Sequence, residues 1–144
     1  MDKSTILKLL TKDNLVQPKV LLIEDCQFDT VFLKRTLEQY YPLSLIDYAN
    51  TKFTALQKLK KNMYDIVLLD LHLPDSVGSC DIKDFKHLCP NTPLIVVTGF
   101  FNNDKLMKAH QYGADGMISK SDLMNDSFEH AVSEAIDNIE AIAS

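Results

Sequence analysis

Short apolar segments alternate along the chain with longer segments in which apolar residues recur at helical spacing. Each apolar segment has the length of a strand, and each longer segment has the length of a helix. This alternation is typical of βαβ units, in which parallel strands are joined by helical crossovers. The apolar segments are residues 19–24, 43–49, 65–70, 94–98 and 115–119.

The polarity of these segments predicts their order in a sheet. Segments 19–24, 65–70 and 94–98 are almost continuously apolar, as strands covered by helices on both faces should be. Segments 43–49 and 115–119 contain polar residues and are therefore predicted to form the edges. With right-handed crossovers, this pattern predicts an α/β fold with a flavodoxin-like (βα)5 doubly wound parallel sheet in the order 2-1-3-4-5.

Two of the intervening segments predict helices with defined faces. Residues 51–63 are expected to bury an apolar stripe made of Phe53, Leu56, Leu59 and Met63. Residues 122–143 are expected to form the last helix, with Ser121 and Asp122 as candidate N-terminal caps.

Length and charge limit the function classes. The chain has 144 residues, which suits one domain of ordinary size. Its formal net charge is −5 and it has no basic stripe, so binding to nucleic acid is not expected. No apolar run approaches the ~20 residues that span a bilayer, and the N-terminus lacks the apolar core of a signal peptide. We therefore expect a cytoplasmic protein that does not contact membranes.

The cysteines give no sign of a disulfide framework or a zinc site. They are Cys26, Cys80 and Cys89, an odd and low number. Cys80, His87 and Cys89 also lack the spacing of zinc ligands. Buried free thiols in a reducing compartment are the expected state.

Residues 1–17 precede the first strand and form a separate N-terminal extension, with the folded domain at 18–144. The extension is predicted to contain a short amphipathic helix, with apolar and basic positions interleaved. Such a short helix is marginal alone, so it is expected to dock on its own domain, on a second copy in a dimer, or on another partner. Its apolar and basic residues are Ile6, Leu7, Leu10, Lys3, Lys8 and Lys12.

Chemically distinctive side chains follow the predicted strands. Glu24 and Asp25 end the first strand, Asp70 ends the third, Thr98 ends the fourth, and Lys120 follows the fifth. The carboxyl ends of parallel strands meet at one edge of a doubly wound sheet, where ligands bind. Three adjacent carboxylates would repel one another. A hard divalent cation relieves that repulsion, and an all-oxygen ligand set suits Mg²⁺.

This set of residues resembles the receiver domain of two-component response regulators, over residues 19–141. The matching motifs are the acidic pair Glu24-Asp25, the segment 68–75, the pair Thr98-Gly99 and Lys120. Each motif is weak alone, but together they occur in the family's order, each at the end of the appropriate strand.

The resemblance implies that Asp70 accepts a phosphoryl group from a histidine kinase or a phosphotransfer protein. It also implies that Thr98 and Lys120 contact the phosphoryl oxygens. Phosphoryl transfer depends mainly on positioning and on neutralising charge, which a lysine and a metal ion can supply. A carboxylate can form the covalent intermediate. The domain would thus be a phosphoacceptor with intrinsic autodephosphorylation, and not an enzyme.

The resemblance further implies a Mg²⁺ site. Asp25 and Asp70 would bind the ion directly, and Glu24 would bind it through water. The backbone carbonyl of His72 would supply a further ligand, while the His72 side chain is expected at the rim.

The resemblance includes two variable positions and two departures from the usual pattern. His72 and Phe100 occupy positions at which receivers vary their phosphoryl lifetime. Ser121 follows Lys120, where many receivers have proline in a cis-peptide loop. Met117 stands where many have the aromatic residue that moves with the threonine on activation.

The family's usual output face is the fourth helix, at about residues 103–112, with the fifth strand. Phe100 and Phe101 lie in the loop before this helix. One ring is expected to pack inside, and the other is free to help form a surface for a downstream partner.

The last predicted helix runs almost to Ser144, so we expect a stand-alone receiver that signals through protein contacts. An alternative is a phosphorylation-independent interaction module that keeps the fold without using the site. A haloacid-dehalogenase-like phosphohydrolase is disfavoured, because it needs a second acid two residues after the nucleophile, where this chain has His72.

Overall fold

The computed structural model describes residues 18–125 and residue 130. Strands and helices alternate along this part of the chain. The strands are β1 (Lys19–Ile23), β2 (Leu45–Ala49), β3 (Ile66–Leu69), β4 (Leu94–Thr98) and β5 (Gly116–Ser119). The helices are α2 (Gln27–Tyr40), α3 (Lys52–Lys61), α4 (Asp81–Leu88), α5 (Asn103–Gln111) and α6 (Lys120–Asn125).

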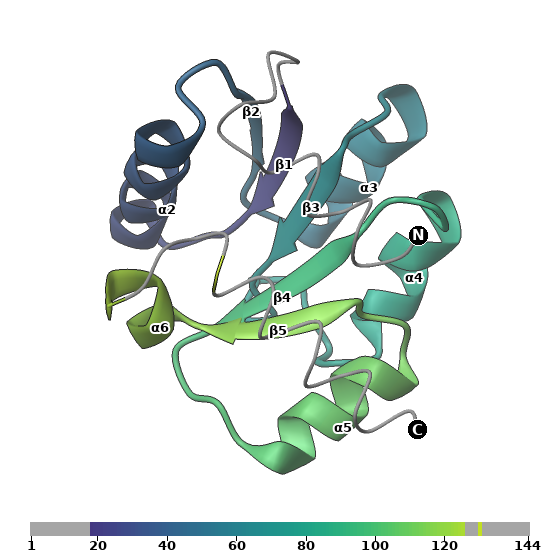
Figure 1. Cartoon of the computed structure of the whole chain (residues 1–144). Helices are drawn as coiled ribbons and strands as arrows, with labels where there is room; N and C mark the ends of the chain where they lie inside the picture. Colours follow the sequence, from purple (N-terminus) through teal and green to yellow (C-terminus); the bar gives the residue numbers. More distant parts are fainter. Residues whose placement is uncertain (1–17, 126–129, 131–144) are drawn as a thin grey trace.

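The strands form one parallel sheet in the order β2-β1-β3-β4-β5 (Figure 1). This confirms the predicted flavodoxin-like fold, with β2 and β5 at the edges. β1 pairs with both β2 and β3, so that Val20 lies opposite Ile46 on one side and Ile66 on the other. The chain reverses its direction of winding at β1 and β3, whose carboxyl ends are therefore adjacent.

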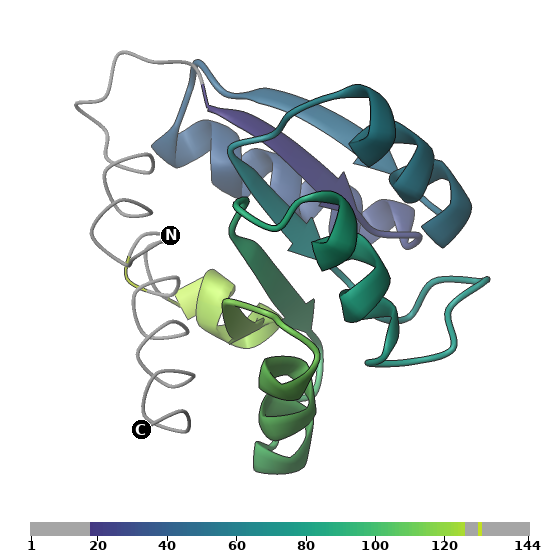
Figure 2. The ribbon, with the colours of Figure 1, turned by 90° about the vertical axis from the view of Figure 1, so that its right-hand side faces the viewer.

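Helices cover both faces of the sheet, as Figures 1 and 2 show. Alternate residues of β1 point to opposite faces: Leu21 belongs to the core beneath α3, α4 and α5, and Leu22 to the core beneath α2 and α6. Both side chains are almost completely buried. Burial on both faces explains why the central strands are continuously apolar.

The predicted apolar stripe of residues 51–63 is partly wrong. Phe53 is 67% exposed and Met63 is 90% exposed, whereas Ala55 and Leu59 are buried. Phe53 lies in the first turn of α3, and Met63 lies beyond the last residue of the helix, so helical spacing does not apply to it.

The predicted caps of the last helix are also wrong. α6 begins at Lys120, directly after β5, which places Ser121 and Asp122 inside its first turn. The hydroxyl of Ser119 accepts the hydrogen bond from the Asp122 N–H instead, at 3.1 Å. Most of the predicted helix 122–143 and the whole extension 1–17 lie outside the described residues.

All three cysteines are free, as predicted, but only Cys89 is buried. Its thiol donates a hydrogen bond to the Phe85 carbonyl at 3.2 Å, and burial raises its pKa. Cys26 and Cys80 are exposed because they precede α2 and α4. Within residues 18–125, no helix has both the length and the apolar character needed to cross a membrane.

Candidate functional site

The site begins with two buried carboxylates at the ends of β1 and β3. Asp70 donates its backbone N–H to the Ile23 carbonyl at 2.9 Å, which continues the pairing of these strands and brings Asp70 beside Glu24. Glu24 is 4% exposed and Asp70 is 5% exposed. Buried carboxylates need compensating charge or hydrogen bonds.

Lys120 supplies that charge from the start of α6. Its ammonium donates to Glu24 Oε2 and to Asp70 Oδ2, both at 3.1 Å, and to Asp29 Oδ2 at 2.6 Å. The positions of Glu24, Asp70 and Lys120 at the ends of predicted strands led us to expect their convergence. There was no such reason to expect Asp29, which lies in the first turn of α2. An acid in that turn is common because it suits the helix dipole, so its sequence position carried no distinct signal.

The two buried carboxyl groups have opposite tendencies to hold a proton. Burial, with Asp70 as a close neighbour, raises the pKa of Glu24 from 4.5 to about 7. Burial also opposes ionisation of Asp70, but hydrogen bonds from Glu24, the His72 N–H and Lys120 outweigh it and lower the Asp70 pKa. Burial would lower the pKa of Lys120, yet the carboxylates raise it. Asp70 is thus the ionised member of the pair.

Asp25 lies apart from this cluster. It is exposed at the turn between β1 and α2. Among the described residues, the carboxylate oxygens that could converge on a metal ion, all within 4.8 Å of one another, come from Glu24, Asp29 and Asp70. The structure therefore brings together two of the three predicted metal-binding acids.

His72 approaches Asp70 through its backbone. Its N–H donates to Asp70 Oδ1 at 2.8 Å, and its side chain is exposed at the rim, as expected. The two oxygens of Asp70 thus have different partners: Oδ1 accepts from the loop and Oδ2 accepts from Lys120.

Thr98 is buried at the end of β4, with its hydroxyl directed to its own loop. Oγ1 donates to the Phe100 carbonyl at 3.1 Å and accepts from the Phe100 N–H at 3.2 Å. A cavity of about 160 Å³ lies beside this part of the site, and Met117 lies in its wall. The cavity is lined by Asp70, Leu71, His72, Gly78, Ser79, Val96, Thr98, Lys105 and Met117.

The two phenylalanines after β4 differ as expected. Phe101 packs against the core, and Phe100 is 68% exposed. The Lys105 ammonium lies 5.2 Å from the centre of the Phe100 ring and donates to the Phe100 carbonyl at 2.9 Å. Among the described peptide bonds none is cis, including the bond between Lys120 and Ser121.

The loop from β3 to α4, which contains His72, is fixed by two acids. Asp75 accepts from the Lys52 and Phe53 N–H groups at 2.7 and 3.0 Å, and so caps α3. Asp81 is 1% exposed and accepts from the Val77 N–H and the Lys52 ammonium at 3.0 and 2.9 Å. The sequence did not predict these contacts, which hold the loop beside Asp70.

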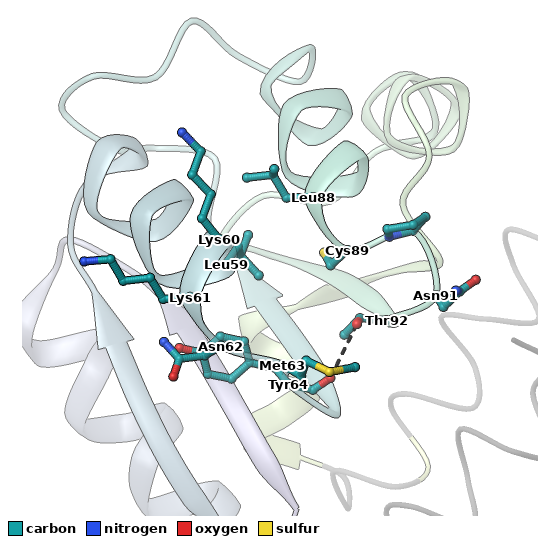
Figure 3. A pocket seen from close by; sticks show the side chains of 11 residues that line it. Leu59, Lys60, Lys61, Asn62, Met63, Tyr64, Leu88, Cys89, Asn91 and Thr92 are labelled. Carbon is teal, nitrogen blue, oxygen red and sulfur yellow. Dashed lines mark hydrogen bonds between the residues drawn. The ribbon is translucent and has the colours of Figure 1, made fainter.

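A second hollow lies at the opposite end of the sheet (Figure 3). This groove of about 270 Å³ is bounded by the end of α3 and by residues 88–92. The Thr92 hydroxyl, just before β4, donates to the Tyr64 carbonyl, just before β3, at 3.4 Å. The described residues that line the groove include no carboxylate or histidine, so they do not repeat the chemistry found around Asp70.

Known proteins share both the sequence pattern and the fold. The chemotaxis protein CheY of Halobacterium salinarum is 28% identical over 102 residues, which cover 71% of this chain and 83% of that protein. The aerobic respiration control sensor protein ArcB of Escherichia coli is 32% identical over 104 residues, which cover 70% of this chain but only 13% of the sensor.

Solved structures share the fold of this chain. A two-component response regulator from Clostridium difficile aligns with a TM-score of 0.66 and 26% identity, covering 72% of this chain and 84% of that chain. A CheY-like receiver domain protein from Methanospirillum hungatei aligns with a TM-score of 0.67 and 24% identity, covering 88% and 99%. The sequence model of the response regulator receiver domain matches residues 20–131. The chain therefore belongs to the response regulator receiver domain family of two-component signalling.

Proposed function

We propose that Asp70 is the phosphoacceptor of a phosphorelay and receives its phosphoryl group from a histidine kinase or a phosphotransfer protein. The observation that carries this proposal is the buried Asp70 carboxyl group, whose Oδ2 lies 3.1 Å from the Lys120 ammonium. In the transfer, an Asp70 oxygen bonds to phosphorus. The nitrogen–phosphorus bond of a phosphohistidine breaks, and its electron pair stays on the imidazole nitrogen.

Lys120 and Thr98 would serve the phosphorylated state. The charge of Lys120 would neutralise the phosphoryl oxygens, where most of the charge of the transition state resides. The hydroxyl of Thr98 would leave the backbone of Phe100 to donate to a phosphoryl oxygen. Both groups lie beside Asp70, because β4 and β5 end at the same edge of the sheet as β3.

The donor set fits Mg²⁺. Glu24, Asp29 and Asp70 gather three carboxyl groups around the one Lys120 ammonium, and a divalent cation beside them would favour the ionised form of Glu24. Glu24, Asp25, Asp70 and the His72 carbonyl would hold it, and all these donors are oxygens. When bound, the ion would neutralise charge on the phosphoryl oxygens. His72 and Phe100 lie where they could tune the phosphoryl lifetime through access of water to Asp70.

The signal would leave through protein contacts. We propose that phosphorylation draws Thr98 toward Asp70 and lets Met117 repack at the cavity that both residues line. This would change the face made by α5 and β5, where a downstream protein would bind. The receiver domain would comprise residues 18–144 and act in the cytoplasm, with residues 1–17 as an extension that docks on the domain, joins two copies or binds another partner.

A second candidate function is a phosphorylation-independent interaction module. The observation that favours it is the Thr98 hydroxyl, which already has a donor and an acceptor in its own loop. Met117 also supplies no aromatic ring for the usual movement with the threonine.

One experiment separates the two candidates. The purified chain is incubated with acetyl phosphate or phosphoramidate, with and without Mg²⁺, and its intact mass is recorded beside that of Asp70→Asn. A gain of one phosphoryl mass that needs Mg²⁺ and Asp70 supports the phosphorelay. If there is no gain and beryllofluoride does not bind either, the interaction module is favoured.

A further inference from the structure

Asp29 makes the shortest contact to Lys120, yet the proposed phosphorelay assigns it no role. Its Oδ2 lies 2.6 Å from the ammonium, compared with 3.1 Å for the Glu24 and Asp70 oxygens. It reaches Lys120 from the first turn of α2, and α6, which begins with Lys120, lies next to α2 (Figure 1).

The three contacts use the full donor capacity of the lysine. An ammonium has three N–H donors, and Asp29, Glu24 and Asp70 each accept from it. A phosphoryl oxygen on Asp70 could therefore gain a hydrogen bond from Lys120 only if one of these acceptors loses its own.

Asp29 is the acceptor that can lose its contact at the lowest cost. Its side chain is 30% exposed, whereas the Glu24 side chain is 1% exposed and the Asp70 side chain is 6% exposed. Water can replace Lys120 at an exposed carboxylate, and the N-terminus of α2 favours a negative charge in its first turn. Glu24 lacks access to water, although its Oε1 accepts from the Cys26 N–H at 3.1 Å.

We infer that Asp29 is a positioning residue that restrains Lys120 in the unphosphorylated protein. It holds the ammonium on the α2 side of Asp70, and a phosphoryl group on Asp70 must draw the ammonium away from it. This inference rests on the proposed function, because it concerns the same lysine and the same phosphoacceptor. It adds a contact between α2 and α6 that opposes formation of the phosphorylated state.

The first test measures the affinity for beryllofluoride in the presence of Mg²⁺ by isothermal titration calorimetry. Asp29→Asn should tighten binding about 5-fold, and Asp29→Glu should restore the affinity of the unaltered chain. Glu38→Gln is the matched control: it removes the same charge from the same helix, but among the described residues the ion pair of Glu38 is with Lys34, at 3.9 Å. In a Lys120→Gln background, Asp29→Asn should change the affinity no more than Glu38→Gln does. An unchanged affinity in Asp29→Asn, or the same tightening without Lys120, would overturn the inference.

The second test needs neither metal nor phosphodonor. In protein with ¹⁵N-labelled lysine, the Lys120 ammonium should give a signal that exchanges slowly with water. Asp29→Asn should speed that exchange several-fold, and Asp29→Glu should restore it. If the Lys120 ammonium exchanges with water equally fast in Asp29→Asn, the inference that Asp29 restrains Lys120 would be overturned. A chain that binds no beryllofluoride but shows the Asp29-dependent exchange would instead overturn the proposed function and keep the contact.

Discussion

The Lys120 ammonium lies 3.1 Å from Asp70 Oδ2, although 50 residues separate the two in sequence. The contact exists because β3 and β5 run parallel and end at the same edge of the sheet, so that the residue after each strand faces the other. It pairs a buried carboxyl group with a cation: hydrogen bonds from Glu24, the His72 N–H and this lysine outweigh burial and lower the Asp70 pKa.

Removing Lys120 should destabilise the metal-free protein. Lys120→Met leaves Glu24 and Asp70 buried without their cation, and breaking a buried ion pair in this way costs about 3 kcal/mol. Urea unfolding at neutral pH measures the loss, and added Mg²⁺ should recover part of it. Lys34→Met removes an exposed cation with a partner at 3.9 Å and should cost less than about 1 kcal/mol. Equal losses in the two variants would contradict the account.

The pKa of Glu24 predicts how stability depends on pH. The folded protein holds a proton on Glu24 up to pH about 7, while the unfolded chain releases it near the ordinary value of 4.5. The folded state therefore binds more protons in this window, and the metal-free protein should lose stability as pH rises through it. The loss should be about 3 kcal/mol at most, since one pKa unit corresponds to ~1.4 kcal/mol.

Glu24→Gln should remove this dependence. Urea unfolding with a chelator between pH 5 and pH 8 compares the two proteins. Asp70 does not contribute to the slope in this range, because its pKa is lowered from 3.8 and it therefore titrates below pH 5 in both the folded and the unfolded state. If the free energy of unfolding falls with pH equally in both proteins, a group other than Glu24 is responsible for the pH dependence.

Two acids of α4 that pair with Lys52 offer a matched pair of variants. Asp81 and Asp84 both accept from the Lys52 ammonium, at 2.9 and 2.7 Å, but their side chains are 2% and 55% exposed. Asp81→Asn should lower the unfolding free energy by about 2 kcal/mol, because the lost charge leaves buried donors poorly paired. Asp84→Asn should cost less than about 1 kcal/mol. Thermal unfolding tests both, and a larger loss in Asp84→Asn would contradict the assignment.

Asp81 should also contribute to unfolding by acid. Burial opposes its ionisation, but hydrogen bonds from Ser76, Lys52 and the Val77 N–H lower its pKa below 3.8. The stability that this carboxylate contributes is therefore present above pH ~3.8 and is lost as the pH falls below that value. Asp81→Asn should flatten the acid limb of the stability curve.

Thr98 should matter more to the phosphorylated state than to the fold. Thr98→Val keeps the side-chain shape but removes the hydroxyl, so it should weaken beryllofluoride binding about tenfold, the value of a hydrogen bond to a charged group. Thr98→Ser keeps the hydroxyl and should bind nearly as well as the unaltered chain. Equal affinity of Thr98→Val and Thr98→Ser would show that the hydroxyl keeps its hydrogen bonds to the Phe100 backbone.

Strand ends were the most informative part of the sequence. The apolar segments predicted the sheet order, and the residues after them predicted that Glu24, Asp70 and Lys120 would converge, because parallel strands share one carboxyl edge. Residues outside the strands were harder to place. Helical spacing assigned Phe53 and Met63 to the core because it does not show where the helix begins and ends.

The contacts that the sequence did not predict are set by loops and first turns. Asp29 occupies a position where acids are common for reasons of helix stability alone. Asp81 reaches Lys52 across 29 residues, and neither residue belongs to a recognisable motif. The hydrogen bond from the Thr98 hydroxyl to the Phe100 carbonyl depends on the course of the loop backbone, which no pattern of side chains specifies.

The central claim is that Asp70 itself carries the phosphoryl group. Borohydride reduces an aspartyl phosphate to homoserine, so chain treated with acetyl phosphate and Mg²⁺ can be reduced, digested and mapped by peptide mass spectrometry. The account predicts homoserine at position 70 and none in samples prepared without Mg²⁺. Homoserine at position 25 or 29, or at no position while beryllofluoride also fails to bind, would contradict it.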